Sequence, residues 1–243
     1  SRRNGILLIS MKSVRDATVA RARVLMRCDF NVPFDRKGAI ADDFRIRSTL
    51  PTIEYVLGKG GKLVLMTHLG DPDGKPARSL SVERIREKLA ELLDTPVAKT
   101  SDCVGKKVED RVGKMKPGEV ILLENLRFHR EEQENNASFA KQLASLGDIY
   151  VNDAFSVCHR AHASVVGVPR LLPSYTGFFL EYELQGLERL LSNPKHPVVA
   201  VIGGKKIESK LPAIDRISKT ADAVLLGNVL ANEVKNKRVK FKN

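Results

Sequence analysis

Charged and polar side chains follow several short apolar segments of this chain, at positions where strands would end. Arg127, Arg160 and His68, with Arg45 beside them, form a candidate anion site. Asp29, Asn31 and Gly70 also follow expected strands, although Asp29 and Asn31 could merely form a turn. Planar guanidinium groups donate pairs of hydrogen bonds to carboxylate and phosphate groups. We therefore interpret these residues as a binding site for a small acid that carries both groups. Any single arginine in such a place is more often a surface residue, so the hypothesis depends on the set.

A parallel sheet would bring these residues together. Continuously apolar segments are typical of strands that are buried on both faces of such a sheet. Ligands of open parallel sheets bind beyond the carboxyl ends of the strands, which is where the candidate residues stand. The expected strands cover residues 23–28, 62–66, 119–123, 148–151, 198–202 and 223–226.

Amphipathic helical patterns alternate with the expected strands, over residues 46–57, 82–92, 139–146 and 181–191. Pro51 should kink the first helix or mark a later start. Ser79 or Ser81 should cap the second helix, and Asn136 the third. The alternation predicts an α/β fold, a doubly wound parallel sheet in a Rossmann-like three-layer αβα arrangement, with the beginning of a second α/β domain.

The same patterns predict the domain organisation. We expect an anion-binding domain over 1–178, an interdomain helix over 179–194 and a second α/β unit over 195–243. About 45 residues bury too little apolar surface to form a stable domain alone.

Composition excludes several classes of protein. Of 243 residues, 42% are hydrophobic and 29% charged, which argues against disorder. No apolar run approaches the roughly 20 residues of a membrane helix, and the run at 6–9 is too short for a signal peptide. Cys28, Cys103 and Cys158 include no close pair, which favours small buried side chains in a reducing cytosol. We expect a cytoplasmic protein without membrane contact.

The net charge of +12 is concentrated at the two ends of the chain. Residues 1–47 hold 11 basic and 5 acidic side chains, and 195–243 hold 11 and 4, whereas 48–194 hold 19 and 20. The electrostatic field of so many basic residues attracts anions, although a basic face that only contacts solvent would have the same composition. Aromatic residues are only 5% and no basic helix interleaves with them, which argues against nucleic acid.

Two further clusters could bind ligands. Gly203 and Gly204 follow an expected strand and precede a helix expected from about Ile207, with Lys206 and Lys210 four residues apart on one helical face. Glycines at such a turn expose N–H groups to phosphate, although a plain glycine turn is the alternative. His159 and His162 match no recognised metal-ligand spacing, so we expect no metal site.

Taken together, seven segments resemble motifs of the phosphoglycerate kinase family. In chain order they are RCDFNVP at 27–33, DFRIR at 43–47, THLG at 67–70, LENLRF at 123–128, VNDAF at 151–155, HRAHAS at 159–164 and IGGKKI at 202–207. The resemblance covers the chain from about Val19 to about Val234.

The resemblance implies reversible phosphoryl transfer between 1,3-bisphosphoglycerate and ADP, giving 3-phosphoglycerate and ATP in glycolysis, with Mg²⁺ carried by the nucleotide. All seven candidate residues would hold 3-phosphoglycerate, so 1–178 would be the domain for this substrate. Arg45 and Lys206 would be catalytic. Gly203, Gly204, Lys206 and Lys210 would bind nucleotide, in an incomplete nucleotide domain over 195–243. We expect a monomer.

The chain departs from the family pattern in four places. Asp71 replaces an arginine, and Ser156-Val157-Cys158 replaces Gly-Thr-Ala. Residues 227–230 hold fewer glycines than the family, and the family continues beyond Asn243. We therefore expect this chain alone to bind 3-phosphoglycerate weakly and to turn over little. The alternative is a non-catalytic anion-binding module. If adding the half of the family's sequence that is missing here restored turnover, the chain would be part of an enzyme, and if it did not, the chain would be a binding module.

Overall fold

The computed structural model describes residues 11–192, 194–204 and 210–237. Contacts divide the chain into two compact units, and the division falls between Glu183 and Leu184. This division lies within helix α6 (Phe178–Ser192). The three-part organisation expected from the sequence stays a prediction.

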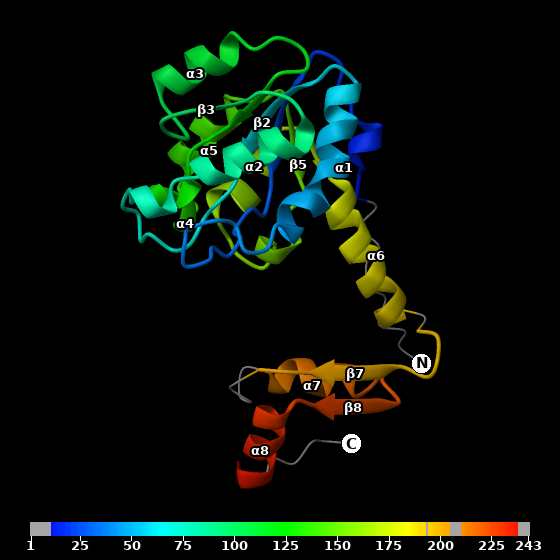
Figure 1. Ribbon diagram of the computed structural model, residues 1–243. Helices are drawn as coiled ribbons and strands as arrows, with labels where there is room; N and C mark the ends of the chain where they lie inside the picture. The colour runs from blue at the N-terminus through cyan, green and yellow to red at the C-terminus, as the bar shows by residue number, and fades with distance from the viewer. Residues whose placement is uncertain (1–10, 193, 205–209, 238–243) are drawn as a thin grey trace. The chain divides into compact units, whose positions relative to one another are not determined.

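The larger unit is built on a six-stranded sheet in the order β3-β4-β2-β1-β5-β6 (Figure 1). Every neighbouring pair of strands is parallel. The strands are β1 (Arg23–Arg27), β2 (Lys62–Met66), β3 (Val97–Lys99), β4 (Val120–Leu122), β5 (Ile149–Asn152) and β6 (Ser174–Thr176). The edge strands β3 and β6 were not predicted, because three residues give no readable pattern.

Helices cover both faces of this sheet. They are α1 (Phe44–Gly58), α2 (Glu83–Leu93), α3 (Lys106–Gly113), α4 (Arg130–Gln133) and α5 (Ala137–Ala144). Short helical turns are η1 (Val14–Asp16), η2 (Arg78–Leu80), η3 (Leu126–Phe128), η4 (Phe155–Val157), η5 (Ala163–Gly167) and η6 (Val168–Arg170). Helix α3 was not predicted. None of the described helices is both long and apolar enough to cross a bilayer.

Alternating strand residues serve the two faces, as the pleat of a strand requires. Val24 and Met26 of β1 join the apolar cluster that includes α1 and α2. Leu25, between them, joins the cluster that includes α3 and α5. The predicted doubly wound α/β fold is confirmed by this arrangement and by the comparisons reported below.

Helix α1 begins at Phe44 and continues through Pro51, so the expectation of a later start is wrong. Pro51 supplies no N–H to the helix, but the buried face formed by Ile46, Ile53 and Val56 holds the helix in place.

A tertiary contact, rather than a neighbouring serine, caps helix α2. Neither Ser79 nor Ser81 caps it, contrary to expectation. Instead, the N–H of Val82 donates to Glu124 Oε1 at 3.0 Å and the Ser81 hydroxyl donates to Glu124 Oε2 at 2.8 Å. The prediction for Asn136 is confirmed, since its side chain accepts the first N–H groups of α5.

The smaller unit contains two parallel strands, β7 (Val199–Ile202) and β8 (Ala223–Leu226), with α7 (Leu211–Ile217) and α8 (Asn228–Lys237). Ile214 of α7 and Leu230 of α8 pack against Ile202 and Leu226.

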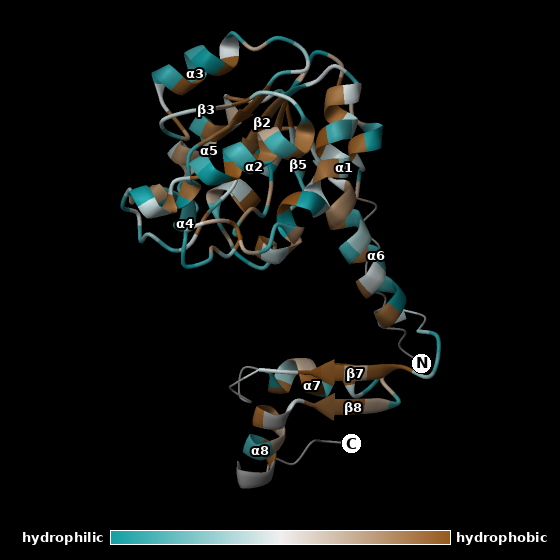
Figure 2. Cartoon of the chain, in the orientation of Figure 1, coloured by the Kyte–Doolittle hydropathy of each residue, from teal (hydrophilic) through white to brown (hydrophobic). Residues whose placement is uncertain are grey.

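The other face of these two strands is open in the described part of the chain. Val199, Val201 and Leu225 are 53%, 76% and 54% exposed, although both strands are strongly apolar (Figure 2). The prediction of burial on both faces is therefore wrong for β7 and β8, because α7 and α8 pack on a single face.

The three cysteines do not share one environment. Cys28 and Cys103 are buried, but Cys158 is exposed, and all three are free thiols. The expectation of burial is wrong for Cys158, which follows the short turn η4 at the surface.

Asp153 joins strand β5 to the first turn of α6. This buried carboxylate accepts the N–H of Leu180 at 2.9 Å and the hydroxyl of Thr52 at 2.7 Å. Gly177 passes so close that an added Cβ would lie 2.4 Å from Asp153 Cγ, which excludes any side chain there. Burial raises the pKa of Asp153 to about 6, although the hydrogen bonds act in the opposite direction.

The raised pKa of Asp153 predicts a pH dependence of stability. The unfolded chain binds this proton only below about pH 4, whereas the folded chain keeps it to about pH 6. The stabilisation is therefore complete at low pH and is lost as the pH rises through this window, by about 3 kcal/mol at most. The lowered pKa of His68 raises stability with pH in both chains, so the Asp153 effect is read as a difference. We expect the wild-type chain to lose this stabilisation relative to Asp153→Asn as the pH rises, measured by urea unfolding of both across the window.

The matched control is Asp73→Asn, which changes an aspartate whose side chain is 82% exposed. That variant should keep the pH dependence of the wild-type chain. The same dependence in Asp153→Asn would show that the buried carboxyl is ionised throughout the range.

Candidate functional site

The candidate site lies where the loops after four neighbouring strands meet. Strands β4, β2, β1 and β5 are adjacent in the sheet and all run in the same direction, so their carboxyl ends share one edge. Six of the predicted residues stand in these loops, and Arg45 stands at the first turn of α1. The loop residues are Asp29, Asn31, His68, Gly70, Arg127 and Arg160.

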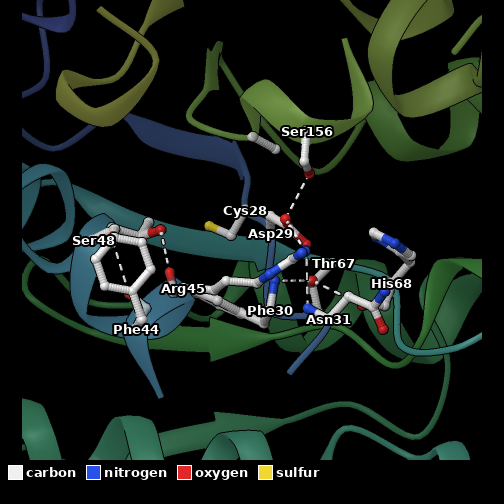
Figure 3. Close-up of polar contacts among 12 residues, drawn as sticks. Cys28, Asp29, Phe30, Asn31, Phe44, Arg45, Ser48, Thr67, His68 and Ser156 are labelled. Atoms are coloured by element: carbon white, nitrogen blue, oxygen red, sulfur yellow. Dashed lines mark hydrogen bonds and ion pairs between the residues drawn. The ribbon is translucent and has the colours of Figure 1, made fainter. Parts of the chain in front are cut away.

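Asp29 collects hydrogen bonds from three parts of the chain. The Nη1 group of Arg45 and the hydroxyl of Ser156 both donate to its Oδ2 atom, the latter at 2.5 Å (Figure 3). The N–H of Asn31 donates to Oδ1 at 3.3 Å. The Arg45 side chain is 46% exposed and carries five N–H donors, so it can also reach an anion in solvent.

His68 is a neutral hydrogen-bond donor in this site. Its Nδ1 atom lies 3.1 Å from Nη2 of Arg27. A guanidinium only donates, so Nδ1 accepts and the imidazole proton lies on Nε2. Burial lowers the pKa of His68 to about 2, and the positive charges of Arg27 and Arg127 act in the same direction.

Hydrogen bonds link the loops after β1, β2 and β4. The side-chain oxygen of Asn31 accepts the N–H of Gly70 at 2.9 Å, and Arg127 Nη1 donates to the Gly70 carbonyl at 2.8 Å. Asn125 Oδ1 accepts the N–H groups of Leu69 and Arg127. The buried Nε of Arg127 has no partner among the described residues, so this side chain retains a free donor.

The site concentrates positive charge. Burial lowers the pKa of Arg127, Asp71 raises it, and the guanidinium groups of Arg160 and Arg27 lower it further. Arg160 is exposed, whereas Arg127 is buried. Asp71, which stands where the family resemblance places an arginine, is 70% exposed and lies 3.8 Å from Arg127 Nη1. An anionic ligand would relieve this repulsion between cations.

Three of the four predicted nucleotide-binding residues lie in the described part of the smaller unit. Gly203 and Gly204 directly follow β7, and Gly204 has a φ of +140°, which favours glycine. Lys210 lies at the N-cap of α7, one residue before the helix, rather than within a helix as expected. Lys206 and the helix start at Ile207 lie outside the described residues.

One group of side chains within the described ranges has metal-ligand character. Ligand-type atoms of Asp102, Cys103 and His129 lie within 4.8 Å of one another. However, His129 Nε2 already lies 2.7 Å from Asp102 Oδ1, and burial raises the pKa of the Cys103 thiol. The ring nitrogen and the carboxylate of this group already contact each other, and we propose no ligand there.

Sequence reasoning missed several residues that build the site. Arg27 ends a strand whose preceding three residues are apolar, and this charge is the one local signal that could have identified it. Ser156 was noted only as a departure from the family, and its bond to Asp29 spans 127 residues. No local pattern predicts a contact of that range.

The backbone of Gly70 predicts the effect of a substitution there. Its φ is +62°, and an added Cβ would lie 2.8 Å from Leu80 Cδ2. We expect Gly70→Ala to lower the free energy of unfolding by about 1–2 kcal/mol, because a side chain is disfavoured in the left-handed region. Urea unfolding measures the change.

The matched control is Gly58→Ala at the last residue of α1, where an added Cβ meets no atom within 4 Å. This change should be neutral or slightly stabilising. Equal effects of the two substitutions would contradict the assigned role of the Gly70 backbone.

Comparison with known proteins places this geometry in a family. The family model for phosphoglycerate kinase matches residues 14–240. The chain is 45% identical over 222 residues to a phosphoglycerate kinase of Coprothermobacter proteolyticus, covering 91% of this chain and 56% of that protein. It is 48% identical over 219 residues to that of Synechococcus elongatus, covering 90% and 54%.

Two solved structures of phosphoglycerate kinases have a fold similar to that of this chain. The crystal structure of phosphoglycerate kinase from Pyrococcus horikoshii OT3 superposes with a TM-score of 0.85 at 34% identity, covering 95% of this chain and 58% of that chain. The structure of phosphoglycerate kinase from Coxiella burnetii gives 0.79 at 33% identity, with the same coverage. The chain spans about half the length of the curated relatives that it matches. From the family model, the relatives and the shared fold together, this chain belongs to the phosphoglycerate kinase family.

Proposed function

We propose that this chain serves reversible phosphoryl transfer between 1,3-bisphosphoglycerate and ADP, which gives 3-phosphoglycerate and ATP in glycolysis. The observation that carries the proposal is the meeting of Arg45, His68, Arg127 and Arg160 at one edge of the sheet, in a chain of this family. Three guanidinium groups and a neutral imidazole donor match a small acid with both carboxylate and phosphate groups.

In this proposal Asp29, Asn31 and the Gly70 loop orient the donors, while His68, Arg127 and Arg160 hold 3-phosphoglycerate. Phosphoryl transfer needs positioning and charge neutralisation more than covalent chemistry. We assign the neutralisation to Arg45 and to Lys206, which would act on the same phosphoryl group.

We further propose that Gly203, Gly204, Lys206 and Lys210 bind the nucleotide, with Mg²⁺ arriving as part of the nucleotide substrate. Backbone N–H groups at a glycine turn and lysine charges both suit polyphosphate. We also propose a monomer that works in the cytoplasm.

The test is calorimetric titration of the chain with 3-phosphoglycerate. We expect the wild-type chain to bind and Arg45→Ala to weaken binding by about ten- to one-hundredfold, the range for a lost hydrogen bond to a charged group. Arg47→Ala is the matched control, because Arg47 lies two residues further in α1 and pairs with Asp43 instead. Separate titration with Mg-ADP tests the nucleotide site.

Thermal unfolding should show that both arginine variants fold as the wild-type chain does. No binding by a folded wild-type chain would contradict the proposed substrate. Wild-type affinity in Arg45→Ala would remove that residue from the site.

Asp71 places a negative charge beside the proposed anion site. We expect Asp71→Asn to strengthen binding of 3-phosphoglycerate by up to about fivefold, because interactions of exposed charges are worth at most about 1 kcal/mol. The gain should shrink as salt is added, since the carboxylate is 70% exposed. Calorimetry at two salt concentrations measures it.

Asp73→Asn is the control, because Asp73 lies in the same loop and pairs with Arg130 rather than with Arg127. Equal gains from both substitutions would mean that only the net charge of the chain matters.

A further inference from the structure

A chain of buried polar groups leads from His68 into the protein. Arg27, Ser164 and Glu132 all have an exposed fraction of 0%. Arg27 Nε donates to the Ser164 hydroxyl oxygen at 3.0 Å. The Ser164 hydroxyl in turn donates to Glu132 Oε1 at 2.5 Å, and the Ser164 N–H donates to Glu132 Oε2 at 2.9 Å. These hydrogen bonds therefore connect the carboxylate of Glu132 to the imidazole of His68 in the candidate site.

The donor and the acceptor of each hydrogen bond between Glu132 and His68 can be assigned. A carboxylate only accepts and a guanidinium only donates. The hydroxyl proton of Ser164 must therefore point to Glu132, which leaves its oxygen lone pairs for Arg27. Arg27 Nη1 donates to the Cys28 carbonyl, and Nη2 donates to His68 Nδ1. The imidazole is left with its proton on Nε2.

Arg27 and Glu132 are charged side chains, and an isolated ion in a protein interior is strongly destabilised. Glu132 has two further neighbours, since its Oε1 atom lies 3.8 Å from His162 Nδ1 and its charge also acts on Arg127. Ser164 bridges Arg27 and Glu132, and its own carbonyl is held by the Tyr150 hydroxyl at 2.8 Å. Without the Glu132 charge, the guanidinium of Arg27 would have no anionic group on this path.

We propose that Glu132 is a positioning residue for the anion site. Acting through Ser164 and Arg27, it holds His68 as a neutral imidazole that accepts at Nδ1 and donates from Nε2. Glu132 itself does not touch the ligand. The choice of 3-phosphoglycerate as ligand rests on the proposed function. The ring form of His68 does not, because it is a property of the chain without ligand.

The test compares Glu132→Gln with Glu131→Gln. Both change a glutamate of α4 by the same atoms, but Glu131 is exposed whereas Glu132 is buried. The first readout is the ¹⁵N NMR spectrum of the histidine rings without ligand, with His68 assigned by a His68→Gln variant. We expect a single Nε2–H form in the wild-type chain and in Glu131→Gln. In Glu132→Gln the Arg27 guanidinium should lose its fixed position and leave Nδ1 of His68, so we expect a mixture of ring forms.

The second readout is the affinity for 3-phosphoglycerate by calorimetry. Glu132→Gln should bind about three- to tenfold more weakly, the effect of one misdirected neutral hydrogen bond, and Glu131→Gln should bind as the wild-type chain does. Ser164→Ala removes the hydroxyl that links Glu132 to Arg27 while leaving both charges in place. It should change the ring form of His68 in the same way.

The outcomes separate the two proposals. If the wild-type chain does not bind 3-phosphoglycerate but Glu132→Gln alters His68, the proposed function fails and the positioning role stands. If the wild-type chain binds, and His68 keeps its Nε2–H form in both Glu132→Gln and Ser164→Ala, the positioning role is overturned. A loss of stability without a change in the His68 spectrum would also overturn it, because that is the behaviour of a purely structural group.

Discussion

Arg27 ends an inner strand of the sheet with its guanidinium entirely buried, and each of its donors must therefore find an acceptor inside the protein. One donor reaches Ser164, one the Cys28 carbonyl and one His68. Burial lowers the pKa of His68, and the charge of Arg27 acts in the same direction. The arrangement of the buried half of the site follows from satisfying this one cation.

The site divides into buried and exposed donors. His68 and Arg127 are buried and are held by several loops, so their geometry exists before any ligand arrives. Arg45 and Arg160 are exposed and add charge at the rim. Asp29 pairs with one donor of Arg45, and the exposed guanidinium keeps further donors for an anion. Preorganised donors favour binding because little reorganisation is needed.

Contacts between distant loops set this geometry. Asn125 joins the loops after β2 and β4 through both of its side-chain groups. Glu124, its neighbour, caps α2 and is held by Lys99 from β3 at 2.8 Å. Two adjacent residues thus connect three strands and one helix. The LENLRF segment carries a structural role as well as the Arg127 donor.

The sequence alone determined the α/β class, four inner strands of the sheet and the loops that carry the candidate donors. These features depend on local hydrophobic periodicity and on the residues directly after each apolar run, which are readable without contacts. Only the tertiary structure decided the strand order, the edge strands β3 and β6, the cap of α2 and the open face of β7 and β8. It also decided the state of His68, because the bond from Arg27 to Ser164 spans 137 residues and that from Ser164 to Glu132 spans 32. Such contacts depend on how the chain packs, and no spacing along the sequence encodes them.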